Sequence, residues 1–282
     1  MSTLRLVVLT AITMVAFAGN SLLCRLALHH TTIDAASFTA IRLISGAIVL
    51  WVVVRLSLNS RTGKGNWLSG FTLFAYAVCF SFAYISLPAG TGALLLFSAT
   101  QATMIGHGLW AGERLRGLQI IGMVLALAGL VGLLLPGLSA PPLAGSALML
   151  AAGVAWGTYS LRGRGRGDPT LVTTGNFLLS VPFAVALVVL SVDGARLDSW
   201  GVGYAVASGV VASGMGYAIW YSVLPSLKAT SAATIQLSVP VIAAFGGIVF
   251  LGESLTVRLA LASVAILGGI ALVILEKQRV AT

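Results

Sequence analysis

Long apolar runs alternate with short polar breaks along the whole chain. The breaks hold charged residues, Pro or Gly, and each run between them is about 20 residues long. A helix that rises 1.5 Å per residue crosses the ~30 Å hydrocarbon core of a bilayer in about that length. The pattern predicts ten membrane-spanning helices, over residues 4–28, 35–56, 66–87, 90–111, 117–136, 142–161, 170–191, 199–224, 229–251 and 257–275.

The composition agrees with a lipid environment. Hydrophobic residues make up 58% of the 282 residues and charged residues only 8%, whereas a soluble domain carries roughly a quarter charged residues. In hydrocarbon every backbone N–H and C=O group needs a partner within the protein, so helices are favoured over an open sheet. We therefore expect an all-α integral membrane protein with the lipid bilayer as its surroundings.

The net charge of +9 does not indicate a nucleic-acid partner, because the Lys and Arg residues are scattered between apolar runs rather than clustered. Their distribution predicts the orientation in the membrane instead. With the N-terminus inside, twelve Lys and Arg residues fall on the cytoplasmic side and three, Arg25, Arg196 and Arg258, fall in the outer loops. Positive charge is concentrated on the cytoplasmic side of membrane proteins, so both termini are expected to be cytoplasmic.

Several short stretches occur twice, separated by a nearly constant offset of 137 to 140 residues. Residues 109–115 read LWAGERL and residues 249–255 read VFLGESL, so that Gly112-Glu113 matches Gly252-Glu253. Residues 84–88 (YISLP) similarly match residues 221–225 (YSVLP). The chain is therefore expected to consist of two related halves.

The two halves are residues 1–137 and 138–282, with five predicted helices each. Because five is an odd number, the second half would enter the membrane upside down relative to the first. Two inverted five-helix repeats related by a pseudo-two-fold axis in the membrane plane are typical of secondary transporters. Substrate sites of such proteins lie near the bilayer midplane, between the repeats.

With this organisation the chain resembles the EamA family of the drug/metabolite transporter superfamily. The resemblance covers nearly the whole chain and is carried by Ala155-Trp156-Gly157, by the R-x-x-x-G of Arg42 to Gly46, and by the two Gly-Glu ends. Residues 94–104 (LLLFSATQATM) further resemble aromatic amino acid exporters of the YddG type. The resemblance implies helices around a central cavity, with the fifth and tenth set aside. It also implies export of amino acids or related metabolites across the bacterial inner membrane.

Aromatic and uncharged polar side chains recur on single faces of the predicted helices. Aromatic faces stack on apolar groups and attract an ammonium group, and amides and hydroxyls hydrogen-bond a carboxylate. Tyrosines near helix ends alternatively anchor a helix at the membrane interface, and Ser and Thr alternatively bond to their own helix. The predicted substrate-binding residues are Asn20, Arg42, Tyr76, Phe80, Tyr84, Ser98, Gln101, Trp156, Tyr159, Tyr217, Tyr221, Gln236 and Ser238.

Four residues within or beside the predicted spans are interpreted individually. Arg42 either snorkels to the outer surface or binds a carboxylate. His107 either senses protons or is a packed neutral side chain. Pro88 and Pro225 stop helices at matching turns of the two halves and are predicted to allow gating movements.

The acidic residues are informative because all of them fall in predicted loops or at helix ends: Asp34, Glu113, Asp168, Asp193, Asp198, Glu253 and Glu276. A proton-coupled pump normally places a carboxylate within the membrane, so facilitated export by alternating access is expected. A broad-specificity drug or metabolite exporter is the main alternative. A carrier of phosphorylated sugars would need several buried cations, and only Arg42 qualifies.

Other classes of protein are less compatible with the sequence. The chain has no paired Asp, H-E-x-x-H or G-x-S-x-G motif, so neither enzyme activity nor a catalytic residue is predicted. Cys24 and Cys79 lack metal-ligand spacing, so no metal or cofactor is expected. A purely structural protein is not excluded by composition. Small residues on the fifth and tenth helices fit packing within the fold or a dimer, so a monomer or weak homodimer is expected.

Overall fold

The computed structural model describes residues 2–57, 63–112, 114–115, 117–137, 139–163, 167–227 and 229–281, without the side chains of 229–231 and 277–281. These ranges are almost entirely helical and contain one isolated bridge, Gly63 to Gly167, outside the helices, which confirms the all-α prediction. The first half contains α1 (Thr3–His30), α2 (Ala35–Leu56), α3 (Trp67–Tyr84), α4 (Ala89–Trp110) and α5 (Gly117–Leu134). The second half contains α6 (Leu143–Gly163), α7 (Pro169–Leu190), η1 (Val192–Gly194), α8 (Ser199–Ala207), η2 (Ser208–Met215), α9 (Gly216–Val223), η3 (Leu224–Ser226), α10 (Ala229–Gln236), α11 (Ser238–Leu251) and α12 (Val257–Ala281).

Two predicted helices are interrupted rather than continuous. The eighth changes from α8 into the π-helical segment η2 before α9 resumes the α-helix. The ninth is broken at Leu237 into α10 and α11. Pro240 accounts for this break, because proline has no backbone N–H and its ring clashes with the carbonyl one turn earlier. The sequence predicted one continuous helix over residues 229–251 because the whole segment is hydrophobic.

By length and composition, eight of the described helical segments are able to cross a membrane. They are α1, α2, α3, α5, α7, the segment from α8 to η3, the segment Ala232–Leu251, and α12. The predicted helices α4 and α6 are not among them, because polar residues such as Gln101 and Tyr159 lower their mean hydropathy. Both of these helices line the cavity described below, where polar side chains are not exposed to lipid.

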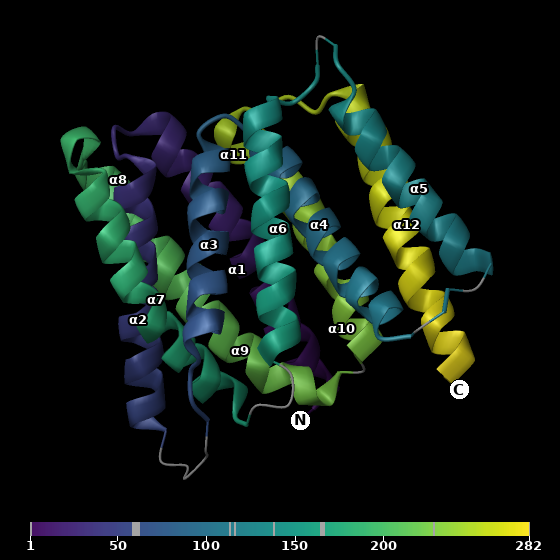
Figure 1. Cartoon of the computed structure of the whole chain (residues 1–282), viewed down its shortest axis with the longest axis horizontal. Coiled ribbons are helices and arrows are strands. Elements are labelled where there is room, and N and C mark those ends of the chain that lie inside the picture. Colours follow the sequence, from purple (N-terminus) through teal and green to yellow (C-terminus); the bar gives the residue numbers. More distant parts are fainter. Residues whose placement is uncertain are drawn as a thin grey trace.

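The two halves interleave (Figure 1). Helix α6 packs against α3 and α4 of the first half, while α1 packs against α8, α9 and α11 of the second half. Helix α2 packs along α7, and α5 packs along α12. Figure 1 shows the α5–α12 pair beside the other helices, as the family resemblance implied. The beginning of α1 and the end of α12 lie at the same end of the molecule (Figure 1).

Equivalent helices of the two halves run in opposite directions. In the α5–α12 pair, Gly122 faces Gly269, and Gly129 faces Ala265, so the pair is antiparallel. The end of α11 likewise lies beside the start of α4, since a side chain at Gly247 would contact Ala89. Gly112 and Gly252 both have positive φ, at 93° and 66°. Glycine tolerates this conformation after a helix, which explains why it recurs in the two Gly-Glu ends. Glu113 lies outside the described residues.

Close packing of α5 on α12 provides a test of stability. A Cβ on Gly122 would lie 2.5 Å from the carbonyl oxygen of Gly269, so we expect Gly122→Ala to weaken this pair by about 1–3 kcal/mol. The measurement is thermal unfolding of the detergent-solubilised protein. Gly132→Ala on the same helix is the matched control, because its Cβ would meet nothing within 4 Å. Equal melting temperatures for the two variants would contradict the packing argument.

Three aspartates stabilise helix starts. The carboxylates of Asp34, Asp168 and Asp198 accept backbone N–H groups in the first turns of α2, α7 and α8. Such N-cap bonds satisfy donors that have no partner within the helix. The placement of these three residues at helix ends is therefore confirmed, and each already has a structural role.

Candidate functional site

A central cavity of about 1490 Å³ lies between the two halves. Loop and helix-end residues around one opening line it, including His107, Arg114, Gly167, Pro169 and Leu227. None of the described loops at the opposite end of the helix bundle contributes to its lining. We call the open side the mouth and the opposite side the sealed end. The ends of α4 and α6, whose residues line the mouth, lie at the same end of the molecule as the beginning of α1 and the end of α12 (Figure 1).

Aromatic rings form one wall of the cavity. Trp156 on α6 lies 4.9 Å from Tyr76 on α3, between ring centroids. It also stacks on Tyr159 and on Tyr217, each with a centroid distance of 5.3 Å and interplanar angles of 23° and 21°. Phe17 extends the cluster, at 5.6 Å from Tyr217. A flat solute therefore meets ring faces contributed by helices of both halves.

Neutral polar groups hold two of these rings in place. Ser208 at the start of η2 donates a hydrogen bond of 2.6 Å to the Asn20 carbonyl oxygen, and the Asn20 amide donates to the Tyr76 hydroxyl at 3.2 Å. On the other wall the Asn176 amide donates to the Tyr159 hydroxyl at 3.5 Å. Gln101 on α4 and Gln236 on α10 also line the cavity. No aspartate or glutamate is among the described lining residues.

Arg42 lies behind the innermost part of the cavity, which we call the floor and which Asn20, Ser21, Tyr76 and Phe80 form. Its guanidinium carbon is 4.8 Å from the centroid of Phe80 and 5.2 Å from that of Tyr76. Only 1% of Arg42 is exposed, so the expectation that it snorkels to the outer surface is wrong. The small residues of η2 allow α2 to pack closely against this segment, because a side chain at Gly209 would collide with the Arg42 carbonyl.

A buried ion pair closes the sealed end. Arg25 Nε lies 3.3 Å from Glu253 Oε1, and Arg25 Nη1 donates to the carbonyls of Tyr84 and Ile85 at 3.0 Å each. Both Glu253 oxygens accept the backbone N–H of Ala89, at 3.1 and 2.8 Å. These contacts join α1, the α3–α4 turn and the α11–α12 loop. The prediction that Arg25 belongs to an outer loop is wrong, because Arg25 lies within α1 and is 9% exposed.

The cavity brings together predicted substrate residues from α1, α3, α4, α6, α9 and α10. They are Asn20, Tyr76, Phe80, Gln101, Trp156, Tyr159, Tyr217, Tyr221 and Gln236. His107 is exposed at the mouth rather than packed in the core, which corrects the interpretation of His107 as a packed side chain.

Other predicted residues lie away from the cavity. Tyr84 is fully buried beside the ion pair, where its hydroxyl donates to the Ala89 carbonyl. Ser98 donates to the Leu94 carbonyl of its own helix, and Ser238 at the start of α11 donates to the Ile235 carbonyl of α10. Their hydroxyl groups therefore have partners without a solute. Arg42 reaches the cavity only through the rings in front of it.

The two predicted gating prolines lie at opposite ends of the cavity. Pro88 precedes α4, directly before the Ala89 N–H that Glu253 binds. Pro225 lies in η3, between the mouth residues Leu224 and Leu227. One proline is thus beside the sealed end and the other beside the open end.

Sequence reasoning missed several residues of the site. Phe17, Thr173 and Asn176 line the cavity, and Arg25 with Glu253 closes it. Asn176 carried a usable signal in the sequence, since an amide within an apolar run is costly when it faces lipid. The ion pair carried none, because its members are far apart in the chain.

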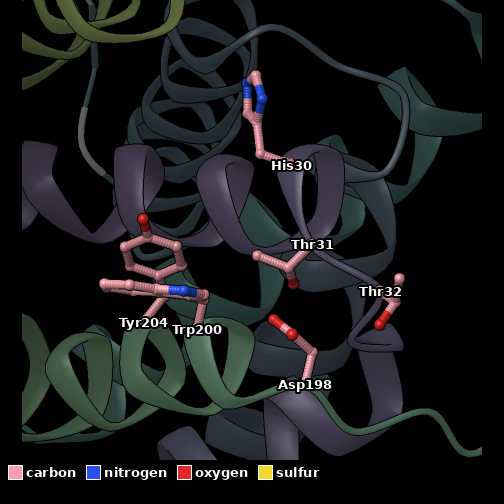
Figure 2. Close-up of a pocket in the computed structure, with 6 residues that line it drawn as sticks. All are labelled: His30, Thr31, Thr32, Asp198, Trp200 and Tyr204. Atoms are coloured by element: carbon pink, nitrogen blue, oxygen red, sulfur yellow. The ribbon is translucent and has the colours of Figure 1, made fainter.

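A second, shallow pocket of about 420 Å³ lies at the sealed end (Figure 2). Thr31 and Thr32 of the α1–α2 loop line it together with Asp198, Trp200 and Tyr204 around the start of α8. Figure 2 shows the Trp200 and Tyr204 rings beside one another. Trp200 is 72% exposed, as is common for aromatic residues at a membrane interface. This pocket is open and separate from the central cavity.

Comparison with known proteins identifies the family. The model of the EamA-like transporter family matches residues 4–135 and again residues 143–275. The chain belongs to the EamA-like transporter family. It is a multi-pass membrane transporter rather than an enzyme, built from two copies of the EamA domain. The predicted family and the absence of enzyme activity are confirmed by this match.

Relatives of this chain include an uncharacterized protein and two proteins whose names describe the export of amino acids or their metabolites. An uncharacterized protein of Pseudomonas aeruginosa is 55% identical over 271 residues, covering 96% of this chain and 94% of that protein. The threonine/homoserine exporter RhtA of Salmonella typhimurium is 29% identical, covering 79% and 76%. A probable amino-acid metabolite efflux pump of Escherichia coli is 26% identical, covering 93% and 92%. A solved crystal structure, 19% identical, shares the fold with a TM-score of 0.66 and covers 99% of this chain and all of the other.

Proposed function

We propose that this EamA-like transporter exports amino acids, aromatic or other neutral ones, and related metabolites across the bacterial inner membrane. The observation that carries the proposal is the central cavity lined by stacked rings and neutral amides. Ring faces fit an apolar side chain and an ammonium group, and amides and hydroxyls fit a carboxylate. The names of the distant relatives, a threonine/homoserine exporter and an amino-acid efflux pump, support the same substrate class.

Alternating access is supported by the arrangement of the two halves. Each half contributes its first helix to the third and fourth helices of the other half. This exchange, together with the antiparallel α5–α12 pair, supports ten spans in two inverted repeats, residues 1–137 and 138–282, around a pseudo-two-fold axis. The distribution of Lys and Arg supports a cytoplasmic position of the mouth and of both termini. The cavity is then open to the cytoplasm and sealed toward the outside.

The polar groups of the cavity support facilitated rather than proton-coupled export. Its described lining has neutral amides and hydroxyls but no carboxylate, and a proton-coupled pump normally carries one within the membrane. Gating movements at Pro88 and Pro225 fit their positions beside the sealed end and the mouth. The close glycine contacts between α5 and α12 within one chain support a monomer or weak homodimer.

Counterflow in proteoliposomes tests the proposal. Vesicles loaded with unlabelled phenylalanine are expected to accumulate labelled phenylalanine, with and without a pH gradient. Threonine, homoserine and a cationic dye are offered as competitors, because the main alternative is a broad-specificity drug or metabolite exporter. Competition by the dye alone would favour that alternative. Counterflow that disappears when the pH gradient is collapsed would rule out facilitated export.

A further inference from the structure

We infer that Arg42 makes the cavity selective for solutes with a carboxylate, which binds at the floor beside the Tyr76 hydroxyl, and against solutes that carry only a positive charge. The inference rests on the proposed function and specifies how the substrate lies in the cavity. It is carried by the burial of Arg42, by its distance from the floor and by the hydrogen bonds of Tyr76.

Arg42 is a buried charge without a counterion in the part of the chain that the structure describes. Its Nε and Nη1 atoms are buried and have no hydrogen-bond partner. Among the described residues the ion pair is that of Arg25 with Glu253, so no described acidic side chain lies within ion-pair distance of Arg42. Arginine stays protonated in proteins, and a buried charge without a partner is strongly unfavourable. An anionic group bound at the floor would compensate this charge.

The charge of Arg42 lies directly behind two rings that form part of the floor. The guanidinium carbon lies 4.8 Å from the centroid of Phe80 and 5.2 Å from that of Tyr76, and both rings line the cavity. Ring faces attract a cation, so these two residues partly stabilise Arg42 when the cavity holds no solute. Electrostatic interactions are weakly screened at such distances inside a protein. The floor is therefore electropositive.

The Tyr76 hydroxyl is able to donate a hydrogen bond into the cavity. It accepts the Asn20 amide at 3.2 Å, and the Asn20 carbonyl oxygen is fixed in turn by Ser208 at 2.6 Å. Arg42 is a donor only and offers no acceptor. The phenolic proton therefore needs an acceptor other than these two residues, and a carboxylate oxygen at the floor is suited to this role.

The rest of the cavity explains why a cation without a carboxylate is excluded. No described lining residue is acidic, so a purely cationic solute meets the field of Arg42 without an opposite charge nearby. An ammonium group beside a bound carboxylate is different, because the solute brings its own negative charge. The rings around Trp156 then receive the side chain of the amino acid.

Three solutes with the same phenyl ring test this selectivity: phenylalanine, 3-phenylpropionate and 2-phenylethylamine. The wild-type protein is expected to bind the first two at least tenfold more tightly than the amine, measured by quenching of tryptophan fluorescence. Arg42→Gln is expected to reduce the affinity for 3-phenylpropionate about tenfold or more. The difference in affinity between 3-phenylpropionate and 2-phenylethylamine is then expected to become smaller. Arg42→Lys is expected to retain most of the preference, because it keeps the charge.

Two further variants separate specificity from stability. Arg55→Gln is the matched control on α2, since Arg55 is exposed and lies over the Trp51 ring, away from the cavity. Tyr76→Phe removes only the hydroxyl and provides a second test if Arg42→Gln does not fold. An unchanged ratio of carboxylate to amine affinity in both Arg42→Gln and Tyr76→Phe would overturn the inference.

The binding assay also separates the two proposals. If no amino acid is transported, the proposed function fails, while the preference for the anionic over the cationic phenyl solute still tests Arg42. If amino acids are transported but the wild-type protein binds 2-phenylethylamine as tightly as phenylalanine, the inference about Arg42 fails alone.

Discussion

Glu253→Gln is expected to open the sealed end of the cavity. The substitution keeps an oxygen that accepts the Ala89 N–H but removes the negative charge that binds Arg25 at 3.3 Å. The side chains of this pair are only 11% and 15% exposed. Breaking a buried pair by removing one member costs about 3–5 kcal/mol. About 3 kcal/mol would shift the ratio of closed to open states roughly a hundredfold toward opening of this end.

Accessibility of a cysteine in the cavity measures this shift. Ser21→Cys, in a background without Cys24 and Cys79, places a thiol one helical turn from Arg25 in the lining of the cavity. A membrane-impermeant thiol reagent added on the side of the sealed end is expected to label it only when Glu253→Gln is present. Asp193→Asn, at an exposed acid of η1, is the matched control. If the reagent labels the Ser21→Cys thiol to the same extent in all these variants, the ion pair does not hold the sealed end closed.

Trp156→Ala is expected to cause the largest loss of transport among single substitutions in the ring cluster. Trp156 contacts Tyr76, Tyr159 and Tyr217 at centroid distances of 4.9, 5.3 and 5.3 Å. Aromatic pairs contribute about 0.5–1.5 kcal/mol each, and a bound solute loses a stacking surface as well. We expect the half-saturating concentration in counterflow to rise at least about tenfold, because 1.4 kcal/mol corresponds to a factor of ten.

Two comparisons show whether this loss reflects substrate binding. Trp156→Phe retains a ring and is expected to recover part of the affinity. Trp110→Ala removes a tryptophan that is 89% exposed and lies outside the cavity, so it is expected to leave transport unchanged. If Trp156→Ala melts at the wild-type temperature and transports with unchanged affinity, Trp156 does not contact the substrate.

The sequence predicted the helices best where apolar length alone sets their limits. Helix α2 covers Ala35–Leu56, the predicted range, because a bilayer span and its flanking polar residues define both ends. The broken ninth helix was missed although Pro240 is visible in the sequence. Its apolar neighbours satisfy the composition of a span, and proline within a span is tolerated when neighbouring helices provide partners. The π segment η2 carried no comparable signal.

Among site residues, prediction succeeded for side chains whose chemistry is costly in lipid. Gln101 and Asn20 lie in the cavity because an unpaired amide facing lipid is unfavourable. Ser98 and Ser238 do not, because each hydroxyl donates to a backbone carbonyl three or four residues earlier in the chain. For Tyr84 no rule of composition separates a cavity position from the packed position that it occupies beside Arg25.

The sequence by itself determined that this protein is an all-helical membrane protein with two related halves, since hydrophobic length and repeated stretches are properties of the chain alone. The tertiary structure decided which polar groups meet. Arg25 finds Glu253 across 228 positions, and Arg42 comes to lie behind Tyr76 and Phe80. Such pairings depend on how helices from both halves pack against one another. Local periodicity specifies only the face of a helix, not its neighbour.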